Sequence, residues 1–112
     1  MYKILVCMWY DEEIKEYADI FRKINEKYCN EQGYDFFYCN KKYTNKPASY
    51  NKIFMFKELL DKNLYDYYVW IDADAHINKT DFRLEYYING YEDKDFIWSG
   101  DITPNINCGV FF

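Results

Sequence analysis

Residues 69–77 read VWIDADAHI, and they give the strongest indication of the fold. It begins inside an apolar run, residues 67–71 (YYVWI), of the kind that forms a strand buried on both faces of a sheet. Two carboxylates, Asp72 and Asp74, follow that run directly. Because ligands of α/β sheets bind beyond the carboxyl ends of the strands, the stretch predicts a central strand with a binding site at its end.

Before and after this strand in the sequence, apolar runs alternate with segments that have helical periodicity. Further apolar runs predict strands over residues 3–10, 35–40, 95–99 and 108–112. Apolar periodicity and end signals predict helices over residues 14–32, 50–62 and 81–89. Strands that alternate with helices favour an α/β fold, with a mainly parallel sheet and helices on both of its faces.

The two longer helices are each expected to bury one apolar face. Gly33 is a natural end for the first helix, and Ser49 is placed to cap the second. The buried face of the first is predicted to consist of Ile14, Tyr17, Ala18, Phe21, Ile24 and Tyr28. That of the second is predicted to consist of Ile53, Phe56, Leu59 and Leu60.

Length and composition exclude several classes of protein. The chain has 112 residues and a formal net charge of -5, which disfavours a nucleic-acid partner. No apolar run reaches the roughly 18 residues of a membrane span, and residues 4–10 lack the flanks of a signal peptide, so we expect a soluble cytoplasmic protein. Four cysteines without a C-x-x-C pair argue against a zinc site and fit buried, reduced thiols.

The two carboxylates after the central strand are candidate metal ligands. Side chains two apart on a strand share a face, roughly 6.5–7 Å apart, so Asp72 and Asp74 could hold a hard divalent cation that stabilises a diphosphate leaving group. A second Asp-x-Asp, Asp93 to Asp95, lies in a polar turn (YEDKD) and is interpreted as a solvated loop. The first motif is distinguished from the second by the buried strand that precedes it, and not by the Asp-x-Asp tripeptide itself.

Several segments, taken in order along the chain, resemble one enzyme family. KILVCMWYDEE, NEKYCNEQGYDF and PASYNKIFMFKELL resemble its first strand, a helix end and a later helix, with Gln32 and Tyr50 in place of the usual His and Trp. YDYYVWIDADAHINKTDFRLE resembles its Asp-x-Asp segment, and DFIWSGD with NINCGVFF resembles its Asn-x-Gly segment. Over essentially its whole length, the chain resembles the galactosyl/mannosyltransferases of glycosyltransferase family 34, whose fold is the Rossmann-like GT-A type.

The resemblance implies an activity and its partners. It implies metal-dependent transfer of a galactose-, mannose- or xylose-like sugar from a nucleotide diphosphate sugar, UDP- or GDP-linked, to a glycan or other hydroxyl acceptor. Asp72 and Asp74 would then bind manganese, or magnesium, together with the donor diphosphate. Residues 1–112 would form a single donor-binding domain. Because residues 110–112 are an apolar strand with no exit, we expect this domain to be the N-terminal portion of a longer catalytic domain.

The resemblance also implies roles for individual residues. The implied donor contacts are Val6, Cys7 and Met8 at the base, Lys52 at the phosphates, and Asn107 and Gly109 near the sugar. Ala73, between the two carboxylates, is a further substrate-binding candidate. Asp101 is the implied catalytic candidate, in contact with the sugar or the acceptor. Simpler interpretations remain open, since Lys52 could be a solvated helix lysine, Gly109 a bulge and Asp101 a turn cap.

His76 and the class of protein leave alternatives open. Strand alternation would place His76 on the same face as Asp74, but the family has an apolar residue at that position, so we do not assign it as a ligand. A non-catalytic fragment that binds a nucleotide sugar is one alternative function. A phosphatase of the haloacid-dehalogenase type is another, although that class carries its Asp-x-Asp motif on the first strand, with Thr or Val shortly after it.

Overall fold

The structure, a computed structural model of the chain, describes residues 2–78, 81–100 and 106–112. Its described strands form one sheet in the order β2-β1-β3-β5-β4. They are β1 (Ile4–Trp9), β2 (Asp35–Cys39), β3 (Tyr67–Ile71), β4 (Trp98–Gly100) and β5 (Ile106–Phe111). β1 is parallel to β2 and β3, while β5 is antiparallel to β3 and β4. The expected α/β fold with a mainly parallel sheet is confirmed, with β5 as the reversed strand.

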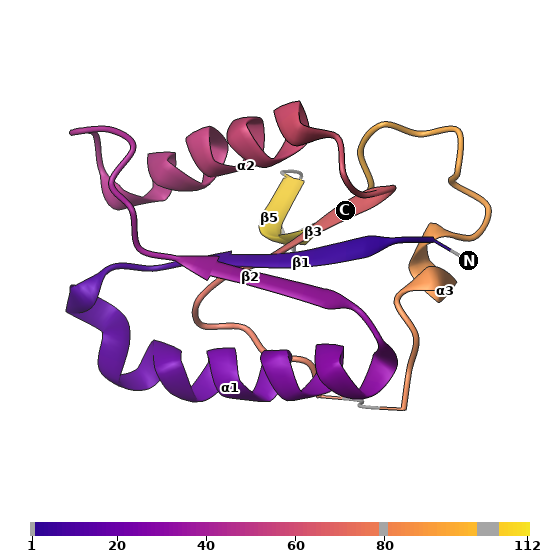
Figure 1. The fold of residues 1–112 in the computed structure, drawn as a ribbon, viewed down its shortest axis with the longest axis horizontal. Helices are drawn as coiled ribbons and strands as arrows, with labels where there is room; N and C mark the ends of the chain where they lie inside the picture. Colours follow the sequence, from indigo (N-terminus) through magenta and orange to yellow (C-terminus); the bar gives the residue numbers. More distant parts are fainter. Residues whose placement is uncertain (1, 79–80, 101–105) are drawn as a thin grey trace.

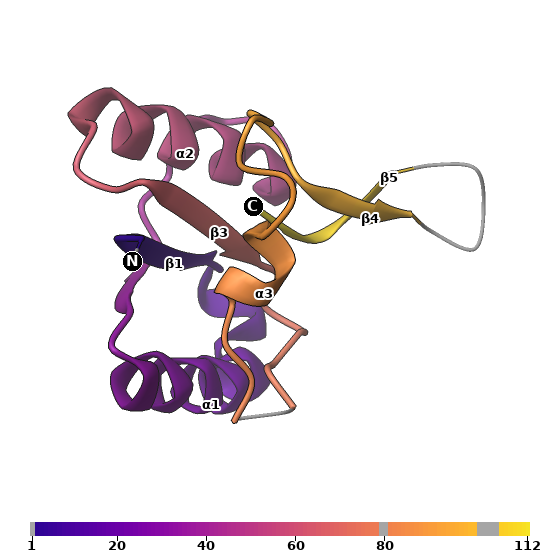
Figure 2. The same ribbon diagram turned by 90° about the vertical axis from the view of Figure 1, so that its right-hand side faces the viewer.

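Helices cover both faces of this sheet and give a three-layer arrangement (Figure 1). α1 (Lys15–Gln32) lies on one face and follows the 3-10 turn η1 (Glu12–Ile14), while α2 (Asn51–Lys62) lies on the other and follows η2 (Ala48–Tyr50). α3 (Glu85–Ile88) is a single turn near β4, and Figure 2 shows β4 and β5 extending away from the helical layers. None of the described helices is both long enough and apolar enough to cross a bilayer.

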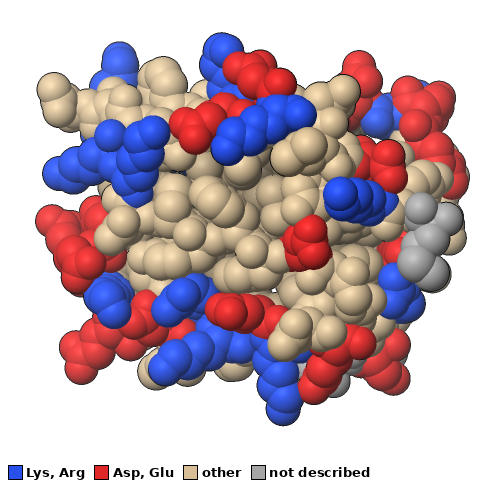
Figure 3. All heavy atoms as spheres, in the orientation of Figure 1, with Lys and Arg blue, Asp and Glu red and all other residues tan. Residues whose placement is uncertain are grey.

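The core lies on the two faces of β1 and β3. Side chains alternate along β1, so that Val6 and Met8 pack toward α1 whereas Leu5 and Cys7 pack toward α2. β3 alternates in the same way, and its residues from Tyr68 to Ile71 are buried. Both apolar runs are therefore doubly covered strands, as their unbroken hydrophobicity predicted. Figure 3 shows charged side chains gathered over the two helical layers, with a mostly uncharged band between them.

α1 ends where the sequence predicted, but its buried face differs. Gly33 adopts φ 82°, and its N–H donates to the carbonyl of Cys29. Tyr17 and Ile24, predicted to be buried, are 46% and 36% exposed, and Asn25 is wholly buried instead. The reason is that residues 75–77 lie against this face, and the side chain of Asn25 provides the hydrogen bonds that their backbone needs.

α2 also begins and packs differently from the prediction. Ser49 lies inside η2, and Tyr50 occupies the N-cap position of α2 without a side-chain hydrogen bond, so the assignment of Ser49 as the cap was wrong. Met55 and Leu59 form the buried face, while Ile53 and Leu60 are 60% and 52% exposed. Met55 and Leu59 lie four residues apart on the stripe that faces the sheet, which is too narrow to include the flanking residues.

The segment after β3 is less regular than expected. Only Glu85–Ile88 is helical within residues 81–89, and Gly90 follows with φ 89°. The fourth strand is Trp98–Gly100 rather than 95–99, and the fifth begins at Ile106, two residues earlier than predicted.

Candidate functional site

A cavity of about 340 Å³ lies beyond the carboxyl ends of β1 and β3. Its polar walls are Asp11, Glu13, Lys52, Asp72 and Asp74. Its other walls are Trp9, Tyr10, Ile14, Tyr17, Ala48, Trp70 and Ala73. This end of the strands is where sheets of this architecture bind ligands.

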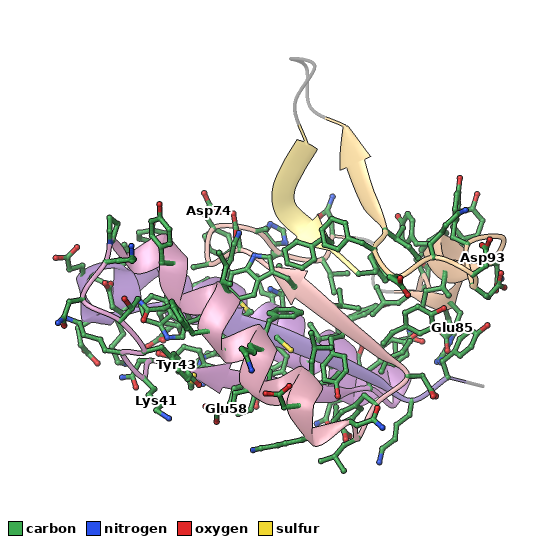
Figure 4. The ribbon with its side chains drawn as sticks, turned by 90° about the horizontal axis from the view of Figure 1, so that it is seen from above. Lys41, Tyr43, Glu58, Asp74, Glu85 and Asp93 are labelled. Carbon is green, nitrogen blue, oxygen red and sulfur yellow. The ribbon has the colours of Figure 1, made fainter. Side chains whose placement is uncertain are left out.

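The two carboxylates of the motif stand in a turn. β3 ends at Ile71, and the backbone N–H of Ala75 donates to the carbonyl of Asp72 over 3.0 Å. The expectation that Asp72 and Asp74 alternate along a strand with His76 was therefore wrong. Asp72 is half-buried and Asp74 is exposed, and Figure 4 shows Asp74 beyond the end of β3. The turn presents both residues to the cavity.

Two neighbours fix the carboxylate of Asp72. The indole Nε1 of Trp70 donates a hydrogen bond of 2.6 Å to Oδ1, and the ammonium of Lys52 lies 3.9 Å from the same oxygen. Lys52 reaches across the Trp70 ring, with 5.2 Å between its Nζ and the ring centroid. The structure thus brings together Lys52 and Asp72, which lie twenty residues apart in the sequence, and places one positive charge at the rim of the carboxylate pair.

His76 takes a different contact from the one that strand alternation suggested. Its ring is stacked on Phe21 of α1, with 5.3 Å between centroids and 7° between planes. Within residues 2–78, 81–100 and 106–112, no group of three His, Cys, Asp or Glu side chains could hold a metal ion. Two carboxylates alone fit a hard cation such as Mg²⁺, which keeps water ligands and takes others from substrate phosphates.

The base contacts implied by family resemblance fall inside the core. Val6, Cys7 and Met8 are wholly buried, and none of them lines the cavity. The next residues along the chain, Trp9 and Tyr10, do line it. The apolar run 3–10 reads as one continuous buried strand, so the sequence did not reveal that its last residues reach the site.

Hydrogen bonds hold these wall residues in place. Trp9 donates from Nε1 to the carbonyl of Lys41 over 2.8 Å, and the Tyr10 hydroxyl donates to Asp19 of α1. Burial and the bond to Asp19 both raise the pKa of Tyr10, so it stays a neutral donor. Asp11 accepts from the N–H of Glu13 and so caps η1.

The remaining candidate residues divide between the cavity wall and less defined parts of the chain. Ala73 lines the cavity between the two carboxylates. Asn107 and Gly109 lie in β5, where Asn107 is paired in register with Ser99, but their side chains are outside the described part. Asp101 lies outside the described residues altogether. The roles of Asp101, Asn107 and Gly109 stay predictions.

A second, larger cavity of about 1010 Å³ borders the same loop. It lies against Val69 and Ile71 of β3 and Phe112 at the end of β5, and its walls are mainly apolar and aromatic. Ala75 and Ile77 line it, so the loop that carries the carboxylates separates the two cavities. No acidic residue is found among its described walls, and the smaller cavity is therefore the candidate for phosphate and metal chemistry.

Comparisons with known proteins point in one direction. Residues 3–111 match the sequence model of the galactosyl transferase GMA12/MNN10 family. The chain is similar in structure to a glycosyltransferase involved in the glycosylation of the major capsid of PBCV-1, with a TM-score of 0.80 and 16% sequence identity. That similarity covers 97% of this chain and 58% of the other, so this chain spans less than two thirds of that protein. A comparison with curated proteins gave no match.

Proposed function

Because the chain belongs to the galactosyl transferase GMA12/MNN10 family, we propose that the smaller cavity binds the donor of a glycosyl transfer reaction. The donor is a nucleotide diphosphate sugar, linked to UDP or GDP, and the acceptor is a hydroxyl group of a glycan or another molecule. The observation that carries the proposal is the cluster of Asp72, Lys52 and Trp70 at the end of β3, next to Asp74.

The carboxylates would hold a manganese or magnesium ion. Bound between Asp72, Asp74 and the diphosphate, such an ion would stabilise the charge that develops on the leaving nucleotide. The protein's own part is orientation. The indole N–H of Trp70 occupies one lone pair of Asp72 Oδ1 and fixes the plane of its carboxylate. Asp74, exposed at the turn, keeps its oxygens accessible.

Lys52 would provide the fixed positive charge that meets the diphosphate. Its side chain is only 21% exposed, so its interactions are less screened than those of a surface lysine. Its position beside the carboxylates places it where a phosphate bound to the same cation would lie.

Aromatic residues at the other end of the cavity would receive the nucleoside. Trp9, Tyr10 and Tyr17 line the wall formed by β1 and α1, and flat aromatic surfaces stack favourably with bases. Tyr17 is 46% exposed and can stack on a base, while Trp9 and Tyr10 are buried and form the wall behind it. We therefore assign the base contact to this aromatic wall, in place of Val6, Cys7 and Met8, which do not line the cavity.

Titration calorimetry tests this proposal and identifies the base. UDP, GDP and their sugars would be titrated into the protein with and without Mn²⁺, and the same titrations would be repeated on the double variant Asp72→Ala/Asp74→Ala. We expect one base to bind only when manganese is present, and the double variant to lose that binding. Equal binding by both proteins, or no binding by a folded wild type, would contradict the proposal.

Two other functions are weaker. The family match leaves no support for a phosphatase, whose motif would stand on the first strand rather than on β3. If the protein bound a nucleotide sugar without transferring the sugar, it would use the same cavity. Release of free sugar or its transfer to an added acceptor, followed by chromatography, separates that case from an enzyme.

A further inference from the structure

Asn25 is a buried polar residue that the proposed donor site does not explain. It lies on the inner face of α1, fully shielded from solvent. Its Oδ1 accepts the backbone N–H of Ile77 over 2.8 Å, and its Nδ2 donates to the carbonyl of Ala75 over 3.1 Å. One side chain therefore satisfies a donor and an acceptor on the two sides of His76.

The segment held in this way is the one that carries the carboxylates. Residues 72–78 belong to no described helix or strand, and the turn bond from Ala75 to Asp72 is local. Asn25 ties this segment to α1, and the ring of His76 stacked on Phe21 adds a second contact with the same helix. Because Ala75 bonds both Asn25 and the carbonyl of Asp72, the anchor is connected directly to the turn.

A buried amide in this position has a physical consequence. A polar group without a partner in the core is costly, so the segment and Asn25 hold each other in a single arrangement. A ligand set for a cation must be held to within roughly 0.5 Å of its working geometry, and a free loop does not achieve this. A helix that is hydrogen-bonded to the loop backbone can hold the ligands in this geometry.

We propose that Asn25 is a positioning residue, which holds residues 72–77 against α1 so that Asp72 and Asp74 are set for the cation and the diphosphate. This inference rests on the proposed donor site. It adds a residue that touches neither substrate nor cation and acts through the loop backbone.

Two variants of Asn25 test the idea. Asn25→Leu keeps a similar volume and removes both hydrogen bonds to the loop, together with the bond of 3.4 Å that Nδ2 donates to Met8 Sδ. Asn25→Asp keeps an oxygen for the N–H of Ile77 but sets a carboxyl oxygen in place of the donor to Ala75, so we expect faster exchange in residues 72–78 and weaker manganese-dependent affinity than in the wild type. It also serves as the second variant if Asn25→Leu does not fold.

Tyr34→Phe is the matched control. The Tyr34 hydroxyl accepts from the N–H of Leu84 over 3.0 Å and donates to Glu85, so the control also breaks two hydrogen bonds on the α1 side of the sheet, one buried and one partly buried. Neither of those bonds reaches residues 72–78. A loss of stability without an effect on the carboxylate loop is expected.

Two readouts are needed. Hydrogen exchange followed by mass spectrometry reports on the amides of residues 72–78, and calorimetry reports nucleoside diphosphate affinity with and without Mn²⁺. For Asn25→Leu we expect exchange in this peptide to rise at least tenfold, and manganese-dependent affinity to fall at least tenfold. Without metal, we expect no binding by either the wild type or Asn25→Leu. Tyr34→Phe should leave both the exchange of residues 72–78 and the effect of manganese unchanged.

The outcomes separate this inference from the proposed function. If folded Asn25→Leu keeps wild-type exchange and metal dependence, or if Tyr34→Phe loses as much manganese-dependent affinity, the positioning role is overturned. If the wild type shows no manganese-dependent binding, the proposed function fails, and the metal role of Asn25 fails with it. In that case, exchange of residues 72–78 would still be faster in Asn25→Leu than in the wild type. This result would show that Asn25 holds the loop although the cavity does not bind a donor through manganese.

Discussion

At the scale of single residues, Lys52 shows what the sequence could and could not reveal about the site. Its role at the phosphates was implied by resemblance, and the structure places it 3.9 Å from Asp72. Its path across the Trp70 ring depends on how α2 packs over β3, which no local pattern encodes. Trp9 and Tyr10 were missed for a related reason, since they are buried members of the same apolar run and no local pattern shows that they line a cavity.

Replacing Lys52 should weaken diphosphate binding specifically. For Lys52→Met we expect the dissociation constant of the preferred nucleoside diphosphate to rise about tenfold in the presence of manganese, because one charge-assisted contact is lost. Lys57→Met is the control, since Lys57 is exposed on the same helix and pairs with Asp61 over 2.9 Å. Calorimetry on both variants checks this, and equal losses would argue against a phosphate contact.

The buried cysteines should resist modification in the folded protein. Burial raises the pKa of Cys29 to about 12 and also raises that of Cys7, so almost no thiolate is present at pH 8. We expect N-ethylmaleimide to label both residues only after unfolding in urea, as measured by mass spectrometry of the peptides. Cys39 is half-buried and should react faster than either. Rapid labelling of native Cys7 would contradict the packing described for β1.

At the scale of elements, the boundaries followed from sequence better than the contacts did. The third strand matches its predicted residues, the first is one residue shorter at each end, and the second is one residue shorter at its carboxyl end. Apolar runs and polar breaks specify such limits locally. The faces of α1 and α2 were predicted less well. Tyr17 and Ile53 are 46% and 60% exposed, because the helical period does not specify which segments pack against each helix.

Gly33 is the clearest local signal, and replacing it should cost stability. It holds φ 82° at the end of α1, and a Cβ there would meet no atom within 4 Å, so the cost of Gly33→Ala is conformational. We expect the free energy of unfolding to fall by about 1 kcal/mol in urea denaturation. Asn63→Gly, at φ 50° after α2, should be neutral or slightly stabilising. A neutral Gly33→Ala would mean that α1 ends differently.

At the scale of the whole molecule, the segment after the carboxylate loop is held to the rest by a polar cluster. Arg83 donates to the carbonyl of Gln32 at the end of α1 over 2.8 Å and pairs with Glu85 at the same distance. The Tyr34 hydroxyl also donates a hydrogen bond to Glu85, and the Tyr28 hydroxyl donates to the carbonyl of Phe82. These contacts join residues about fifty positions apart, and local sequence patterns do not predict such contacts. The helix expected over residues 81–89 was therefore predicted too long.

This cluster predicts how stability depends on pH. Burial raises the pKa of Glu85, but hydrogen bonds from Arg83 and Tyr34 outweigh it, so the pKa lies below its usual value. The stabilisation is therefore complete above about pH 4.5 and is lost as the pH falls through the lowered folded-state pKa. Glu85→Gln should lower the free energy of unfolding by about 1.5–3 kcal/mol at pH 7, and the difference should shrink in acid.

Urea denaturation at several pH values measures this dependence. Glu58→Gln is the control, because Glu58 forms an exposed pair with Lys41 over 3.5 Å and should contribute less than about 1 kcal/mol. A difference between wild type and Glu85→Gln that stays constant from pH 7 to pH 3 would show that ionisation of Glu85 does not contribute.

The central claim is that Asp72 and Asp74 hold a cation that also binds the donor diphosphate. The most direct measurement is a crystal structure with Mn²⁺ and the nucleoside diphosphate that binds in solution, with anomalous data collected at the manganese edge. We predict one anomalous peak within about 2.0–2.6 Å of a carboxylate oxygen of the motif, in contact with the diphosphate and beside Lys52. A bound nucleotide with its manganese away from both carboxylates would contradict the account.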